Sequence, residues 1–239
     1  MPTDTDATVR RKVQNLFTNK YENRMSLSYH PIGEMRQKTD SPRKGRPRSF
    51  DVDEALDQAL EVFRRKSYEG TSISDLTEAM GVERPSLYAA FGDKEQLFRK
   101  VLDRYVAQTM DFMQSAAQEK TARGFVQRIM LGAVENLTDP LNPPGCLTVQ
   151  GALACGEESE PVRKELISRR EQVEGAIRDR LRRAKKEGDL PVDCDPSDLA
   201  RYDATLINGI AVQAAGGTSR KELKRVVDAA MRGWPQCVQ

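Results

Sequence analysis

The sequence predicts an all-α protein of about nine helices, and two observations indicate this class. Apolar residues recur at spacings of three and four in one segment after another, whereas no stretch alternates convincingly as a β-strand. Most of these segments begin at Asp, Ser, Thr or Pro and end at Gly, the residues that start and stop helices. A chain of 239 residues can bury a sizeable core in one large domain or two small ones.

The expected helices follow one another along most of the chain. The first starts at Asp51, with acidic residues in its first turn and basic residues in its last, as the helix dipole favours. Two short helices come next, and Gly81 separates them because glycine tolerates the left-handed conformation of a sharp turn. After Asp51 the helices are expected at 72–80, 84–91, 94–118, 122–138, 146–156, 161–187, 197–215 and 219–232.

The basic charge of the chain is concentrated at its N-terminus. Residues 1–48 hold eleven lysines and arginines against five acidic residues, whereas residues 49–105 hold eight against twelve. Residues 1–48 are also polar, contain several prolines and show no apolar periodicity, so we expect a disordered basic tail. A further hypothesis is that translation starts at Met35, or that residues 1–34 are dispensable.

Composition disfavours several classes of function. No apolar run approaches the roughly 18 residues of a membrane span, and the first residues lack the apolar core of a secretory signal. We therefore expect a cytoplasmic, nucleoid-associated protein with no membrane partner. The four cysteines match neither a zinc site nor a CxxC pair, and the one histidine, His30, lies in the polar tail. We expect no metal, no cofactor and no catalytic site.

The stretch "TSISDLTEAMGVERPSLYAAFGDKEQLF", residues 71–98, carries the functional signal. Its two short helices, together spanning 72–91, meet at residues 81–83, a turn of the length and composition found in helix-turn-helix units. In such units the first turn of the second helix approaches base edges in the major groove of DNA. Arg84 and Ser86 place hydrogen-bond donors in that turn, so the pattern predicts sequence-specific DNA binding.

Other residues complete these expected contacts. Pro85 makes the first turn rigid and offers an apolar face to a thymine methyl, Ala89 keeps the next turn slim, and Tyr88 can place its hydroxyl on a phosphate. The expected DNA-binding unit, residues 49–105, has a net negative charge, so its affinity for phosphate must come from local cations. The segment before the first helix supplies four of them, Arg43, Lys44, Arg46 and Arg48. The alternatives are that Tyr88 is boundary packing and that this segment is merely solvated.

Residues 50 to about 98 resemble the DNA-binding domain of the TetR family of bacterial transcriptional regulators. The strings "ALDQALEVF", "YEGTSISDLTEAMGV", "SLYAAF" and "DKEQLF" carry the resemblance. It implies that Thr71 and Lys94 contact phosphates, with Tyr88 beside them. Ser72, which like Thr71 can cap the following helix, belongs to the same predicted set.

The resemblance also implies the domain organisation. A three-helix DNA-binding domain is expected over residues 49–109, and a larger helical domain that dimerises and binds an effector over 110–235. Dimerisation is expected through the last two helices, where small residues flank a stripe formed by Leu199, Tyr202, Leu206, Ile210 and Ala214. The alternative is that this stripe packs on its own domain.

Two features of the middle helices are candidates for signal recognition. An effector pocket could be lined by Phe112, Met113, Ile129, Met130, Leu147 and Tyr202, although such residues are more often core. Cys146 follows Pro-Pro-Gly at an expected helix start, where a thiol becomes more reactive, and it is a candidate redox sensor. Its alternative is a buried inert cysteine. Cys146 and Cys155 would point in opposite directions on one helix, so a disulfide between them is not expected.

These observations predict a homodimeric DNA-binding regulator. The favoured form is a repressor that binds a palindromic operator and is released by an unknown small molecule or a thiol-reactive signal. The alternatives are a transcriptional activator, and a DNA-binding protein that has no effector. The lack of a nucleophile–base pair disfavours an enzyme. The net negative charge of residues 49–105 disfavours a protein that binds DNA without sequence specificity.

Overall fold

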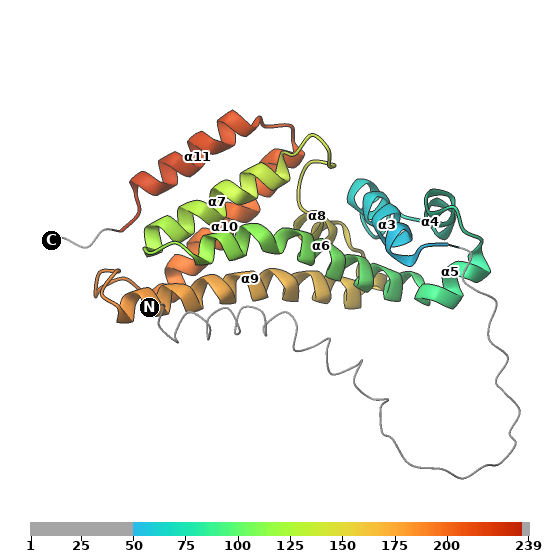
Figure 1. The fold of residues 1–239 in the computed structure, drawn as a ribbon, viewed down its shortest axis with the longest axis horizontal. Helices are drawn as coiled ribbons and strands as arrows, with labels where there is room; N and C mark the ends of the chain where they lie inside the picture. The colour runs from blue at the N-terminus through green and yellow to red at the C-terminus, as the bar shows by residue number, and fades with distance from the viewer. Residues whose placement is uncertain (1–49, 236–239) are drawn as a thin grey trace, which may run out of the picture. The chain divides into compact units, whose positions relative to one another are not determined.

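The computed structural model describes residues 50–235, which contain nine α-helices, one short 3-10 turn and no strand (Figure 1). The prediction of an all-α fold is therefore confirmed for this part of the chain. The predicted basic tail, with Arg43, Lys44, Arg46 and Arg48, lies outside the described residues. In chain order the elements are α3 (Val52–Lys66), α4 (Ile73–Met80), α5 (Arg84–Phe91), α6 (Lys94–Ala117), α7 (Ala122–Leu137), α8 (Leu147–Ala154), η1 (Glu157–Ser159), α9 (Glu160–Lys186), α10 (Pro196–Ala215) and α11 (Arg220–Arg232).

Local sequence explains where the first helices begin and end. The Asp51 carboxylate caps α3 by accepting hydrogen bonds from backbone N–H groups two and three residues later. Ser72 and Asp75 form a reciprocal capping box at the start of α4. Gly81 ends α4 with a φ of 62°, in the left-handed region where side chains are strained. α5 starts three residues later with Pro85 in its first turn, as the sequence predicts.

A first cluster of buried apolar side chains forms around α3, α4, α5 and the N-terminal half of α6. Phe63 and Phe98 meet edge to face at its centre, with ring centroids 4.8 Å apart. The cluster also takes in Leu147 of α8 and Leu166 of α9. The helix-turn-helix unit therefore shares its core with α8 and α9, and this packing sets its orientation relative to them.

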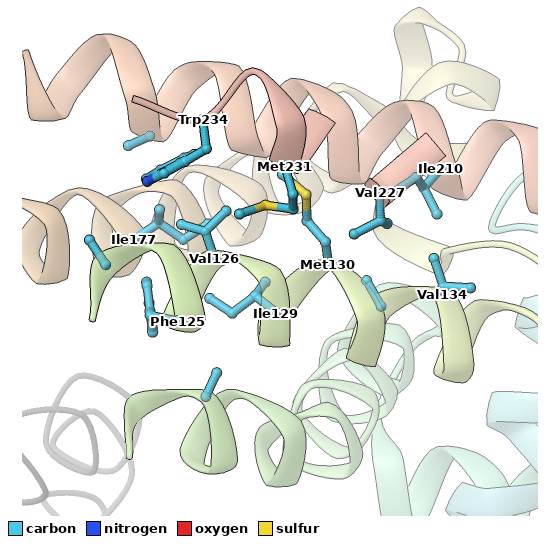
Figure 2. Close-up of a cluster of buried hydrophobic side chains, with 14 of the residues drawn as sticks. Phe125, Val126, Ile129, Met130, Val134, Ile177, Ile210, Val227, Met231 and Trp234 are labelled. Carbon is cyan, nitrogen blue, oxygen red and sulfur yellow. The ribbon is translucent and has the colours of Figure 1, made fainter. Parts of the chain in front are cut away.

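A second cluster lies among α7, α9, α10 and α11. In Figure 2, Val227, Met231 and Trp234 from the C-terminal segment face Val126 and other apolar side chains of α7. α6 reaches both clusters, since Tyr105 belongs to the first and Ala116 to the second. The predicted domain boundary at residue 109 falls on α6 between these two residues and stays a prediction.

Asp203 is an exception within the buried face of α10. Its side chain is 1% exposed, and neither carboxylate oxygen has a hydrogen-bond partner among the described residues. Burial away from water disfavours the charged form and raises the pKa of Asp203 to about 8. The carboxyl group is therefore mostly neutral in the folded protein at pH 7, whereas it is ionised in the unfolded chain.

We expect stability to fall with pH because of Asp203. Below about pH 4 the carboxyl is neutral in both states. As the pH rises towards 8, only the unfolded chain releases the proton, which lowers the free energy of unfolding. Asp203→Asn should remove this loss, so that wild type falls by about 2–4 kcal/mol more than the variant between pH 5 and 8. Urea unfolding at several pH values measures the difference.

Asp198→Asn, an exposed acid on the same helix, is the matched control and should keep the wild-type pH dependence. Equal pH slopes for wild type and Asp203→Asn would show that this carboxyl is ionised in the folded state.

Candidate nucleic-acid interface

The surface of α5 has the form that groove recognition needs. Arg84, Pro85, Tyr88 and Ala89 are exposed, and Tyr88 keeps 48% of its surface accessible. The opposite side of the helix is fixed in the first cluster by Leu87 and Phe91 (both 2% exposed or less). Ser86 lies half-buried between the two faces. Four of the predicted groove-facing residues therefore share one exposed, rigidly supported surface.

The guanidinium group of Arg84 already has a partner within the unit. Its Nη2 atom donates a hydrogen bond of 2.8 Å to the Ser74 hydroxyl, which links the first turn of α5 to α4. Both side chains are exposed. A contact between Arg84 and a base would require this bond to be exchanged.

Thr71 does not lie as the resemblance implies. Its side chain is 2% exposed, and its hydroxyl donates a 2.6 Å hydrogen bond to the backbone carbonyl of Ser67. The hydroxyl proton is therefore not free for a phosphate in this conformation.

Ser72 is exposed and is the residue that caps α4. Asp75, its partner in the capping box, also accepts a hydrogen bond from Lys66 at 2.6 Å. These bonds hold the pKa of Asp75 well below its usual range.

Two lysines in the first two turns of α6 lie near other elements of the helix-turn-helix unit. Lys94, at the start of α6, places its ammonium group 4.2 Å from the ring centroid of Tyr68, and partial burial lowers the pKa of Lys94. Lys100 donates to the carbonyl of Ala90 at the end of α5. Sequence analysis identified Lys94 but missed Lys100, because its position depends on how α6 crosses α5.

Four of the six residues predicted to line an effector pocket belong to or pack against one buried cluster, and two do not. Ile129 and Met130 are buried within the second cluster, and Leu147 is buried within the first. Phe112 and Met113 are partly buried against the second cluster. Tyr202 is 48% exposed on α10. The apolar face of α7 is packed by side chains of α10 and α11, as in the alternative of ordinary core residues, and the effector pocket stays a prediction.

A surface groove of about 470 Å³ lies elsewhere, against α6, α7 and the start of α11. Of the predicted lining only Phe112 takes part in it. Polar side chains make up most of the remaining wall, which consists of Gln108, Gly132, Glu135, Asn136, Asp139, Pro140 and Arg220.

α10 has two different faces, and the predicted dimer stripe is divided between them. Ile210 and Ala214 are buried against their own chain, so for these two residues the alternative of internal packing is correct. Leu199 and Leu206 are partly buried against the same cluster. Tyr202, Gly209 and Val212 lie on the exposed side at helical spacing, and Val226 of α11 is exposed as well.

Cys146 occupies the N-cap position of α8, as predicted. Its sulfur accepts a 3.4 Å hydrogen bond from the Tyr105 hydroxyl and lies 3.1 Å from the Thr148 hydroxyl. Cys155 caps the other end of the same helix, and burial raises the pKa of its thiol. Both cysteines are free thiols. Cys146 therefore lies half-buried at the point where α6 and α8 meet.

None of the helices between residues 50 and 235 has the length and apolar character needed to cross a membrane. Within the same residues, no three His, Cys, Asp or Glu side chains are grouped in a way that could hold a metal ion.

Family comparisons agree with this geometry in both halves of the chain. The model described as "Bacterial regulatory proteins, tetR family" matches residues 55–101, and "Tetracyclin repressor-like, C-terminal domain" matches residues 125–230. The transcriptional repressor ComR of Escherichia coli K12 is 32% identical over 198 residues, which cover 82% of this chain and 94% of ComR. The chain belongs to the TetR family.

Further TetR-family relatives support the same conclusion. The repressor AcnR of Corynebacterium glutamicum is 30% identical over 176 residues, which cover 73% of this chain and 87% of AcnR. A solved structure of a CifR cysteine mutant in complex with 26-bp operator DNA is 42% identical, with a TM-score of 0.77. It matches 80% of this chain and 100% of CifR. This TetR-family chain is therefore a DNA-binding transcriptional regulator.

Arg84→Ala should weaken operator binding by about 1–3 kcal/mol and relax the base preference of the protein, because it removes the guanidinium group that is predicted to contact a base. Fluorescence anisotropy with the preferred operator and its single-base variants measures both effects. Arg182→Ala, an exposed arginine of α9, is the control and should leave affinity and preference unchanged. An unaltered base preference in Arg84→Ala would assign Arg84 to the phosphate backbone instead.

Proposed function

We propose that this TetR-family regulator is a homodimeric repressor that recognises a palindromic double-stranded DNA operator. The observation that carries the proposal is the exposed face of α5, which presents Arg84, Pro85, Tyr88 and Ala89 on a helix anchored by Leu87 and Phe91. ComR and AcnR are named repressors, and CifR was solved on operator DNA, which supports the same role here.

The exposed face formed by α10 and α11 is the proposed dimer interface. Tyr202, Val212 and Val226 each leave more than 40% of their surface accessible and would offer apolar area to a second copy. Gly209 lies on the same face, and a β-carbon added to it would meet nothing within 4 Å. This space allows a helix of the second copy to approach closely. Two-fold symmetry of the dimer then requires two inverted half-sites in the DNA.

The proposed release signal acts at Cys146. A group added to its sulfur would displace the Tyr105 hydroxyl and push α6 and α8 apart. Because α6 also belongs to the core of the DNA-binding unit, such a change would favour orientations of α5 that fit the operator less well.

Selection of binding sites from a random double-stranded DNA pool tests the proposal. The full-length protein at physiological salt should enrich an inverted repeat, and sedimentation should give the mass of a dimer. Failure of a folded protein to enrich any sequence would contradict operator recognition. Enrichment of a single half-site by a monomer would contradict the dimer.

We expect wild type to lose operator binding after treatment with iodoacetamide and Cys146→Ser to retain it. The Cys146 thiolate displaces iodide, so a carbamidomethyl group is added to sulfur and the thiol proton passes to solvent. Mass spectrometry confirms the adduct, and anisotropy with the selected operator measures binding. Cys194→Ser is the control and should respond like wild type. Equal loss of binding in Cys146→Ser would reject the thiol signal while leaving operator recognition intact.

A further inference from the structure

Helix α8 is held at both ends by Arg64, in the last turn of α3, and by Glu69, in the turn that follows α3. Before α8, Arg64 donates from Nη1 to the Asn142 side chain at 2.7 Å and from Nη2 to the Pro143 carbonyl at 3.3 Å. After α8, the backbone N–H of Gly156 donates to Glu69 Oε1 at 3.1 Å. The two residues lie five positions apart in sequence, yet their partners lie on opposite sides of α8.

The surface between these two contacts is apolar. Leu147 and Ala152 of α8 belong to the same buried cluster as Leu60 and Phe63 of α3. Apolar packing of this kind is strong but has little directional preference, so it permits small rotations of one element on another. Hydrogen bonds are directional, and those at the two ends of α8 limit such rotations.

Arg64 has a second connection to the same region. Its guanidinium carbon lies 5.7 Å from the ring centroid of Tyr105, whose hydroxyl bonds to Cys146. Glu69 also has a second connection, because a hydrogen bond with the Ser159 side chain lowers the pKa of this carboxylate. Arg64 and Glu69 therefore each contact more than one group in the segments that flank α8 or pack against it.

We propose that Arg64 and Glu69 are positioning residues that set operator affinity by fixing the DNA-binding unit on α8. The inference rests on the proposed operator recognition and adds residues that do not read DNA. Arg64 at the end of α3 and Glu69 in the following turn both bond to segments that flank α8, and the carboxylate of Glu69 is repelled by phosphate. Loss of either contact lets the unit adopt more orientations, and DNA binding must then restrict them.

Arg64→Ala and Glu69→Ala should each weaken binding to the selected operator about three- to tenfold, a loss of the size expected for a hydrogen-bonded contact. The dependence of affinity on salt concentration should stay as in wild type, because no phosphate contact is lost. Sedimentation and thermal unfolding establish that the dimer and the folded state persist.

Two neighbours on α3 provide charge-matched controls. Arg65 and Glu61 form an exposed ion pair of 3.7 Å with each other and have no bond to the loops around α8. Arg65→Ala and Glu61→Ala therefore change the net charge equally but should leave operator affinity within about twofold of wild type. If these controls lose as much affinity as Arg64→Ala and Glu69→Ala, the effect comes from charge and the proposal is wrong.

A substitution at Gly156 tests whether Glu69 acts through this hydrogen bond. Gly156 has φ −76°, and Cys155 before it is extended with ψ 127°, so both residues accommodate proline at position 156. Gly156→Pro removes the N–H donor and should weaken operator binding as Glu69→Ala does. The double variant should bind no more weakly than Glu69→Ala alone, since that substitution already removes the contact with Gly156.

Glu69→Gln separates positioning from a general loss of folding. Its amide oxygen can still accept from Gly156, so it should keep near-wild-type affinity. Additive effects of Glu69→Ala and Gly156→Pro, or wild-type affinity in Glu69→Ala, would overturn the inference. Absence of operator binding by the wild-type protein would instead refute the proposed function.

Discussion

The continuity of α6 is the constraint on which the rest of the structure depends. Its first half contributes Leu97, Phe98 and Leu102 to the cluster under the helix-turn-helix unit, and its last residues reach the second cluster at Ala116. A helix transmits displacement along its axis with little loss, because each turn is hydrogen-bonded to the next. The two cores are therefore joined by one continuous helix, which also contacts α7.

Apolar contacts stabilise the fold, whereas polar contacts mainly set the orientation of its elements. Apolar side chains supply most of the cohesion, both within the two clusters and where α8 and α9 meet the DNA-binding unit. Polar contacts lie mostly at the edges, where water keeps each of them weak. Their directions nevertheless select among orientations of similar packing energy. Asp203 departs from this division, because it places an unpartnered carboxyl inside the second cluster.

Local patterns explain why most of the fold was predictable. Capping residues, Gly81 and apolar spacing are properties of neighbouring residues, and they gave every helix within the described range with nearly its observed bounds. The exposed face of α5 followed from the same patterns. Contacts between distant segments were not predictable, such as Arg64 with Asn142, 78 residues apart, or Glu69 with Gly156, 87 residues apart. The lining of an effector pocket was not predictable for the same reason, because only tertiary packing decides whether Ile129 faces a cavity or a neighbouring helix.

The hydrogen bond between Arg84 and Ser74 would give an arginine that contacts DNA two bonded states. Away from DNA, the guanidinium group is satisfied by a hydroxyl of its own domain. A guanine would offer it two acceptors in place of one. Arg84 would therefore leave Ser74 only for a DNA contact that stabilises the guanidinium group more than this bond does, and the internal bond reduces the gain from every weaker contact.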